Sequence, residues 1–181
     1  MNKNNLEIAA RLLEKYGYLK KVAGKNFDKA CEVVAVMHET NRGVIVSGAC
    51  GVGKSCFCQA AAKIFGCQYF IDMKEPISSG WFTDEDHTIR LLESSVCLDD
   101  VGCERVINIY GDRVESFSSF IERYHSRLIN DTKDRRIFIS TNLFDGDFTK
   151  RYTARVTDRL LEICAAWKME GKSKRKAVIV K

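Results

Sequence analysis

The segment from Gly48 to Ser55 constrains this chain more than any other part of its sequence. It reads Gly-Ala-Cys-Gly-Val-Gly-Lys-Ser and fits the pattern G-x-x-x-x-G-K-S/T. Glycines allow a tight turn and a close approach to a phosphate, and successive N–H groups before a helix N-terminus attract anions. A β-branched run at 43–47 precedes the segment and a helical pattern at 54–65 follows it. The pattern therefore predicts a phosphate loop that binds a nucleotide.

The residues of this loop have expected roles. Lys54 is expected to neutralise the β- and γ-phosphates of ATP, and the Ser55 hydroxyl to help hold Mg²⁺. The loop backbone and the first helical turn are expected to supply the other contacts. The predicted nucleotide-binding residues here are Gly48, Ala49, Cys50, Gly51, Val52, Gly53, Lys54, Ser55 and Cys56.

Short apolar strands alternate with helical patterns along the 181 residues. This order predicts an α/β fold in one domain, with a mostly parallel sheet covered by helices on both faces. The expected strands are 43–47, 68–71, 95–98, 136–141 and 177–180, and the expected helices are 6–22, 27–40, 54–65, 83–93, 113–130 and 154–164.

Two consecutive carboxylates end one of the buried strands. Asp99 and Asp100 follow Val96-Cys97-Leu98, and the carboxyl ends of parallel strands form the ligand-binding edge of such a sheet. Asp99 is expected to hold Mg²⁺ together with Ser55, and Asp100 to activate the attacking water. Asn142 follows another strand, where its amide would orient that water. The alternative for all three residues is a turn, in which Asp and Asn are common.

Two arginines share a face of the last predicted helix. Arg155 and Arg159 are four residues apart, so their side chains lie on the same side of the helix. One interpretation is a solvated surface pair, which the local sequence favours. The other is an arginine finger that reaches the ATP of a neighbouring subunit and stabilises the charge of phosphoryl transfer.

Composition excludes several classes of protein. No stretch approaches eighteen consecutive apolar residues, and the N-terminus lacks the apolar region of a signal peptide. A cytoplasmic protein that does not contact a membrane is therefore expected. The eight cysteines form no C-x-x-C pair and are expected to be reduced. Residues 167–181 hold six cations and one anion, which equals the formal net charge of +5, and they form either a solvated tail or a phosphate contact.

Taken in order, the motifs resemble those of a known family. Besides the phosphate loop they are Leu98-Asp99-Asp100-Val101-Gly102, Tyr110-Gly111, Ile139-Ser140-Thr141-Asn142-Leu143, Tyr152-x-x-Arg155-Val156-x-Asp158-Arg159-Leu160 and Gly171-Lys172-Ser173-x-Arg175. From about Gly43 to Arg175 the chain resembles the AAA+ ATPases of the DnaC-type helicase loaders, and it is similar to the IstB-type transposition helper ATPases. The resemblance implies a P-loop fold of the ASCE type, with five parallel strands between helices and no separate lid domain.

The resemblance also implies roles for single residues. Asn142 matches the sensor 1 position, Arg159 with Arg155 the finger that acts in trans, and Arg175 the sensor 2 arginine that contacts nucleotide in cis. Helices at 104–130 would match an insertion that contacts single-stranded DNA. Its candidate phosphate contacts are Arg113, Arg123 and Arg127, for each of which a solvated surface position is the alternative.

The function implied is that of a Mg²⁺-dependent ATPase in DNA replication. It would assemble with copies of itself on single-stranded DNA and handle a replicative helicase. Residues 1–40 are expected to form a short helical segment that contacts a partner, and 41–181 the ATPase domain with its basic C-terminal segment. Asp100 stands where many AAA+ proteins have the longer Glu, so slow hydrolysis is expected. The alternatives are a transposition helper with a transposase partner, a small-molecule kinase, and a nucleotide-dependent clamp without hydrolysis.

Overall fold

Five parallel strands form the central sheet of the computed structural model, which describes residues 3–75, 82, 84–104, 107–109, 112–114, 116–130, 133–143 and 146–174. The strand order is β2-β3-β6-β1-β7. Strand β6 thus lies between the strand that leads into the phosphate loop and the strand that carries the two aspartates. The bounds are β1 Gly43–Gly48, β2 Tyr69–Asp72, β3 Val96–Val101, β6 Ile137–Thr141 and β7 Cys164–Met169.

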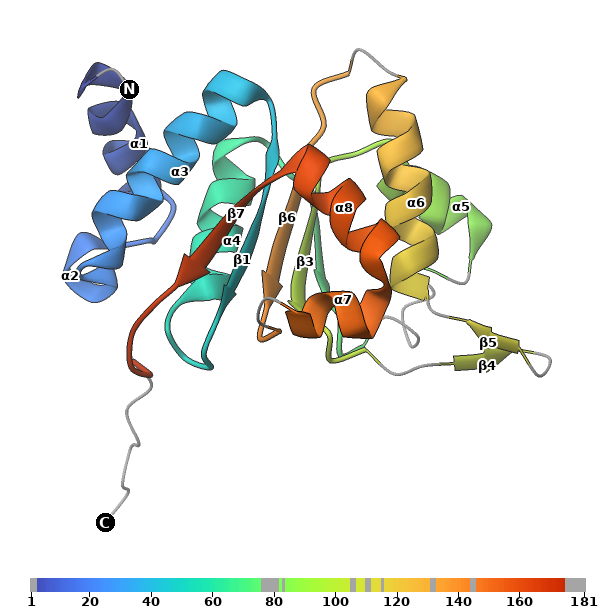
Figure 1. Ribbon diagram of the computed structural model, residues 1–181. Coiled ribbons are helices and arrows are strands. Elements are labelled where there is room, and N and C mark those ends of the chain that lie inside the picture. The colour runs from blue at the N-terminus through green and yellow to red at the C-terminus, as the bar shows by residue number, and fades with distance from the viewer. Residues whose placement is uncertain are drawn as a thin grey trace.

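Helices cover both faces of this sheet (Figure 1), which confirms the predicted α/β architecture. One face is covered by α1 Lys3–Lys15, α2 Lys20–Ala23, α3 Asn26–Thr40 and α4 Lys54–Ile64. The other is covered by α5 Glu85–Leu92, α6 Ser116–Ile129, α7 Gly146–Tyr152 and α8 Ala154–Ile163. None of the described helices is both long and apolar enough to cross a membrane.

Alternation along the strands divides the hydrophobic core into two layers. Val44 and Val46 pack with α1, α3 and α4, whereas Ile45 packs into the layer beneath α6 and α8. Successive side chains of a strand point to opposite faces, which explains why strands buried on both sides are apolar throughout. Leu13 and Phe27, from the N-terminal helices, belong to the same layer as Val44. The first forty residues therefore share a core with the sheet.

The helix predicted at 6–22 is interrupted in the structure. Helix α1 ends at Lys15, Gly17 adopts a positive φ of 93°, and α2 begins at Lys20. A left-handed residue cannot continue an α-helix, and glycine adopts that conformation without steric strain. The break turns residues 17–23 toward the phosphate loop.

The prediction of helices throughout 104–130 is wrong in its first half. Strands β4 Ile107–Ile109 and β5 Asp112–Val114 form an antiparallel hairpin, and α6 begins only at Ser116. Ile and Val favour extended backbone, and Gly111-Asp112 is a typical turn pair. The hairpin projects beyond the sheet beside the carboxyl ends of its strands (Figure 1).

The fifth strand of the described sheet is one that the sequence analysis does not predict. It is β7, which pairs with β1 along its whole length, whereas the strand expected at 177–180 lies outside the described residues. The signal was present in the alternation of buried Cys164, Trp167 and Met169 with exposed Ala166 and Lys168. The sequence patterns place no element at 165–169, directly after the helix predicted at 154–164.

Candidate functional site

The phosphate loop connects β1 to α4 with the backbone that its sequence predicts. Gly51 and Gly53 have φ values of 79° and 112°, a region that side chains other than glycine rarely adopt. A side chain at Gly51 would also collide with Ser173, which lies over the loop. Val52 is fully buried in the core, so it can offer a ligand only its backbone. The loop thus leads directly into the N-terminus of α4.

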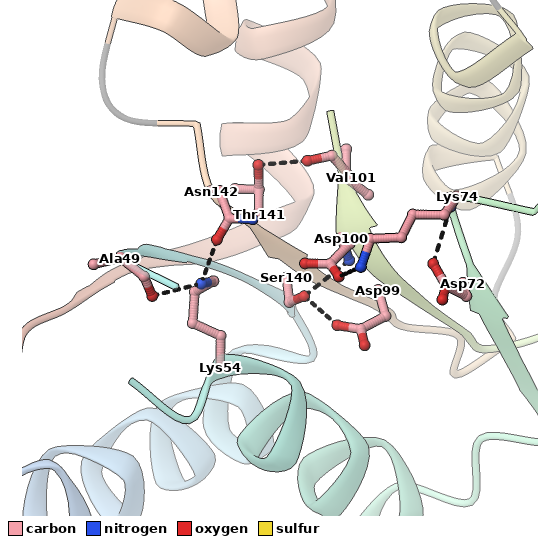
Figure 2. A network of polar contacts seen from close by, with 10 residues as sticks. All are labelled: Ala49, Lys54, Asp72, Lys74, Asp99, Asp100, Val101, Ser140, Thr141 and Asn142. Carbon is pink, nitrogen blue, oxygen red and sulfur yellow. Dashed lines mark hydrogen bonds and ion pairs between the residues drawn. The ribbon is translucent and has the colours of Figure 1, made fainter. Parts of the chain in front are cut away.

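Lys54 is buried, and its ammonium is held by three acceptors, of which Figure 2 shows Ala49 and Asn142. Nζ donates to the carbonyls of Gly48 at 2.8 Å and Ala49 at 3.0 Å, and to Asn142 Oδ1 at 2.8 Å. The structure therefore places Asn142, which directly follows β6, beside the phosphate loop. Burial lowers the pKa of Lys54, and the charge of Asp100 opposes this effect.

The lowered pKa of Lys54 predicts a pH dependence for any nucleotide that binds in this loop. A phosphate binds the protonated ammonium, so affinity should fall as pH rises through the pKa of the free protein. Because that pKa is lowered, the loss should begin at a lower pH than the ordinary lysine value of 10.5 implies. Titration of a fluorescent ATP analogue from neutral to alkaline pH measures this directly. Affinity that stays constant until ordinary lysines titrate would contradict it.

A bulge at the end of β3 separates the two aspartates. The register with β6 shifts between Leu98 and Val101, and Asp100 has a positive φ of 55°. Ser140 Oγ donates to Asp99 Oδ1 and accepts the Asp100 N–H at 3.1 Å. Consecutive residues of a regular strand point to opposite faces, whereas a bulge re-aims one of them. Asp100 thereby lines a cavity beside the phosphate loop, whereas Asp99 accepts the hydrogen bond from Ser140.

The Asp100 carboxylate forms an ion pair with Lys74, which follows β2 (Figure 2). The main chain at Lys74 is fixed, because its N–H donates to Asp72 Oδ1 at 2.9 Å. The hydrogen bond with Asp100 raises the pKa of Lys74 above its ordinary value. The sequence analysis missed this lysine. Its position two residues after Asp72, at the carboxyl end of a parallel strand, was the signal that could have found it.

A cavity of about 490 Å³ joins these groups, a volume typical of ligand pockets, which measure roughly 300–1,000 Å³. Polar and charged groups line the part next to the phosphate loop. Tyr18, Leu19, Val22 and Ala23 form an apolar part that the sequence analysis missed. Its complete lining is Gly17, Tyr18, Leu19, Val22, Ala23, Cys50, Gly51, Gly53, Lys54, Ser55, Cys56, Lys74, Asp100, Asn142 and Lys174.

Residues that follow β7 complete this cavity. The Lys174 N–H donates to the Gly51 carbonyl at 2.9 Å, and Lys174 Nζ donates to the Ala23 carbonyl at 2.9 Å. The basic C-terminal segment therefore reaches the phosphate loop through Lys174. Arg175, the residue predicted to contact nucleotide, lies outside the described residues, so its role stays a prediction.

Arg155 and Arg159 do not line the cavity. Both lie on α8, on the face of the sheet opposite α4 (Figure 1). Arg155 Nε and Arg159 Nη1 lie 3.2 Å and 3.4 Å from the same Glu122 Oε1 of α6. One carboxylate thus serves two guanidinium groups.

The candidate DNA contacts on α6 are paired with carboxylates of neighbouring elements. Arg123 forms an ion pair with Glu85, and Arg127 lies 3.2 Å from Glu93. Pairs as exposed as these add little stability and exchange partners readily. Their contact with DNA stays a prediction, as does that of Arg113, whose side chain lies outside the described part.

The chemistry of Ser55 and Asp99 fits a magnesium ion. A hydroxyl and a carboxylate are oxygen donors, which Mg²⁺ prefers, and this ion usually takes few protein ligands together with substrate phosphates and water. Asp99 uses one oxygen for Ser140 and retains the other. No group of three or more His, Cys, Asp or Glu side chains in the described ranges could form a metal site.

Comparison with solved structures identifies the fold. The chain matches the DnaC helicase loader with a TM-score of 0.55 and 17% identity, over 80% of this chain and 90% of that one. It matches AMPPCP-bound DnaA from Aquifex aeolicus with a TM-score of 0.57 and 17% identity, over 83% of this chain and 49% of that one. A DNA replication initiation factor matches with a TM-score of 0.54 and 20% identity, over 81% of this chain and 47% of that one. No family model and no curated protein matches the chain.

These matches and the strand order place the chain in one class: it has the fold of the AAA+ P-loop ATPases. The resemblance to DnaC-type loaders that the motifs predict is thereby confirmed at the level of the fold. The chain spans about half the length of the second and third of these structures. At 17–20% identity the likeness is one of fold, so the activity has to be argued from the site itself.

Proposed function

We propose that this protein binds ATP with Mg²⁺, hydrolyses it slowly, and uses it in DNA replication to assemble on single-stranded DNA and handle a replicative helicase. The observation that carries the proposal is the set of groups around one cavity. Lys54 and Asn142 meet at 2.8 Å, Asp100 lines the same cavity, and apolar side chains at 18–23 suit a nucleoside. The single-stranded DNA and the helicase come from the resemblance to helicase loaders.

The residues divide the work of hydrolysis. Lys54 and the loop N–H groups hold the β- and γ-phosphates, and Asn142 orients the attacking water. Asp100 accepts a proton from this water. The water oxygen bonds to the γ-phosphorus, and the bond between the γ-phosphorus and the bridging oxygen breaks, so that ADP leaves with that oxygen. Ser55 and Asp99 would hold Mg²⁺, which neutralises charge on the phosphate oxygens when bound. The shorter reach of Asp100 compared with Glu explains the slow rate.

The position of the two arginines supports action between subunits. Arg155 and Arg159 lie outside the cavity of their own subunit and share the single carboxylate of Glu122. A neighbouring subunit that places its γ-phosphate beside α8 would complete its site with Arg159. Hydrolysis would then require assembly, and DNA would promote it by aligning subunits.

The first test of this function is ATP hydrolysis per subunit across a range of protein concentrations, with and without single-stranded DNA. Specific activity should rise with protein concentration, and DNA should lower the concentration that is needed. Fast turnover that is independent of both would contradict the proposal, because each subunit would then work alone. Turnover that depends on an added nucleoside monophosphate would indicate a kinase instead.

A further inference from the structure

Lys74 is the lysine of the cavity that is paired with a carboxylate. Lys54 is held by two carbonyls and an amide, and Lys174 Nζ by the Ala23 carbonyl. The Lys74 ammonium bonds instead to Asp100, the group expected to activate water. In the structure as it stands, this carboxylate is therefore neutralised by its neighbour.

The side chains of Lys74 and Asp100 are accessible to solvent, and only the main chain at Lys74 is fixed. The side chain of Lys74 is 53% exposed and that of Asp100 is 20% exposed. The main chain is held on both sides of the bend, because the Met73 N–H donates to the Asp99 carbonyl at 2.9 Å and the Lys74 N–H to Asp72 at 2.9 Å. The four-carbon side chain of Lys74 can thus change partners while its backbone stays in place.

The strand order of the sheet determines how close the Lys74 ammonium lies to the phosphate-binding end of the cavity. Lys54 Nζ reaches Asn142 at the end of β6, and the Asp100 end of β3 is the next strand along. Neighbouring strands are about 4.8 Å apart. The Asp100 end of β3, where the Lys74 ammonium lies, is therefore roughly one strand spacing from the strand end that carries Asn142.

We propose that Lys74 is a γ-phosphate-binding residue that exchanges Asp100 for the terminal phosphate of ATP. The inference rests on the proposed binding of ATP in this cavity. A terminal phosphate carries more negative charge than one carboxylate, so an ammonium at equal distance is attracted to it more strongly. An ion pair as exposed as this one contributes little by itself, so the exchange costs little.

The exchange couples two events at the site. ATP draws Lys74 away and leaves Asp100 free to accept a proton from water. ADP has no γ-phosphate, so the ion pair remains and the carboxylate stays neutralised. Lys74 therefore distinguishes ATP from ADP, and it frees the base only when there is a bond to break.

The test compares two nucleotides in a lysine variant without charge. Lys74→Met should weaken binding of AMPPCP about tenfold or more, the usual size of a lost charged hydrogen bond, and that of ADP by less than about twofold. Lys74→Arg should recover most of the loss because it keeps the charge. Calorimetric titration of both nucleotides with Mg²⁺ gives the two affinities, and thermal melting checks the fold.

Lys174→Met is the matched control, because Lys174 lines the same cavity but bonds to the Ala23 carbonyl. It should change the two affinities by similar factors. Equal losses of AMPPCP and ADP in Lys74→Met, or no loss of either, would overturn the role of Lys74. A selective loss of AMPPCP in both variants would also overturn it, because general cavity charge would explain the result. A wild-type protein that binds neither nucleotide would overturn the proposed function itself.

Discussion

Lys54→Ala should weaken nucleotide binding by about a hundredfold and thereby abolish nucleotide-dependent binding to DNA. The variant removes the cation that faces the phosphates and the donor to three acceptors of the loop and β6. Loss of a buried charged hydrogen-bonding group of this kind weakens binding by about a hundredfold. Titration with a fluorescent ATP analogue measures the loss, and DNA binding is compared with and without ATP.

Lys63→Ala provides the control, because Lys63 is an exposed lysine in the last turn of the same helix. It should bind ATP as the wild type does. Since Lys54 is buried, thermal melting has to show that Lys54→Ala still folds. A folded Lys54→Ala protein with unchanged ATP-dependent DNA binding would refute the assignment of this loop as the nucleotide site.

Arg159→Ala should bind ATP normally and lose most of its hydrolysis. Arginine fingers contribute about 10³–10⁵-fold to the rate of phosphoryl transfer, and Arg159 lies outside its own cavity. Mixing this variant with Lys54→Ala should restore part of the activity, because the second protein supplies Arg159 and the first supplies a complete nucleotide pocket. Phosphate release from each protein alone and from the mixture measures this complementation.

Arg90→Ala is a suitable control, since Arg90 is an exposed arginine on α5, which covers the same face of the sheet. It should keep full activity, because its nucleotide pocket and its Arg159 are both intact. If mixtures are no more active than the average of their components, the action of Arg159 between subunits is wrong. If Arg159→Ala also fails to bind ATP, its role is within the subunit.

The parts of the fold that could be predicted are those in which a local pattern determines the outcome. The phosphate loop and the strands before Asp99 and Asn142 have strong local signals, and the structure places them at one edge of the sheet. The hairpin at 107–114 and strand β7 were missed. The first is short, and the second is an edge strand in which exposed Ala166 and Lys168 interrupt the continuous apolar run typical of strands buried on both faces.

The parts of the site that the sequence did not predict depend on contacts between distant segments. Lys74 and Asp100 are 26 positions apart, and their pairing follows from the order of β2 and β3. The apolar end of the cavity exists because Gly17 ends α1 and α2 turns toward the phosphate loop. No local pattern encodes either arrangement, because each requires the sheet to be assembled first.

The connection between the last strand and the first helices has a thermodynamic consequence. Asn26 Nδ2 donates to the Glu170 carbonyl at 2.9 Å, and Lys174 bonds to both Gly51 and Ala23. The cavity is therefore closed by segments about 150 positions apart, and it exists only in the fully folded chain. A ligand that binds only the folded state stabilises it by an amount that grows with ligand concentration. If the cavity binds a nucleotide as proposed, the bound nucleotide would connect the early and late segments of the polypeptide, and its departure would lower the free energy of unfolding of the whole domain.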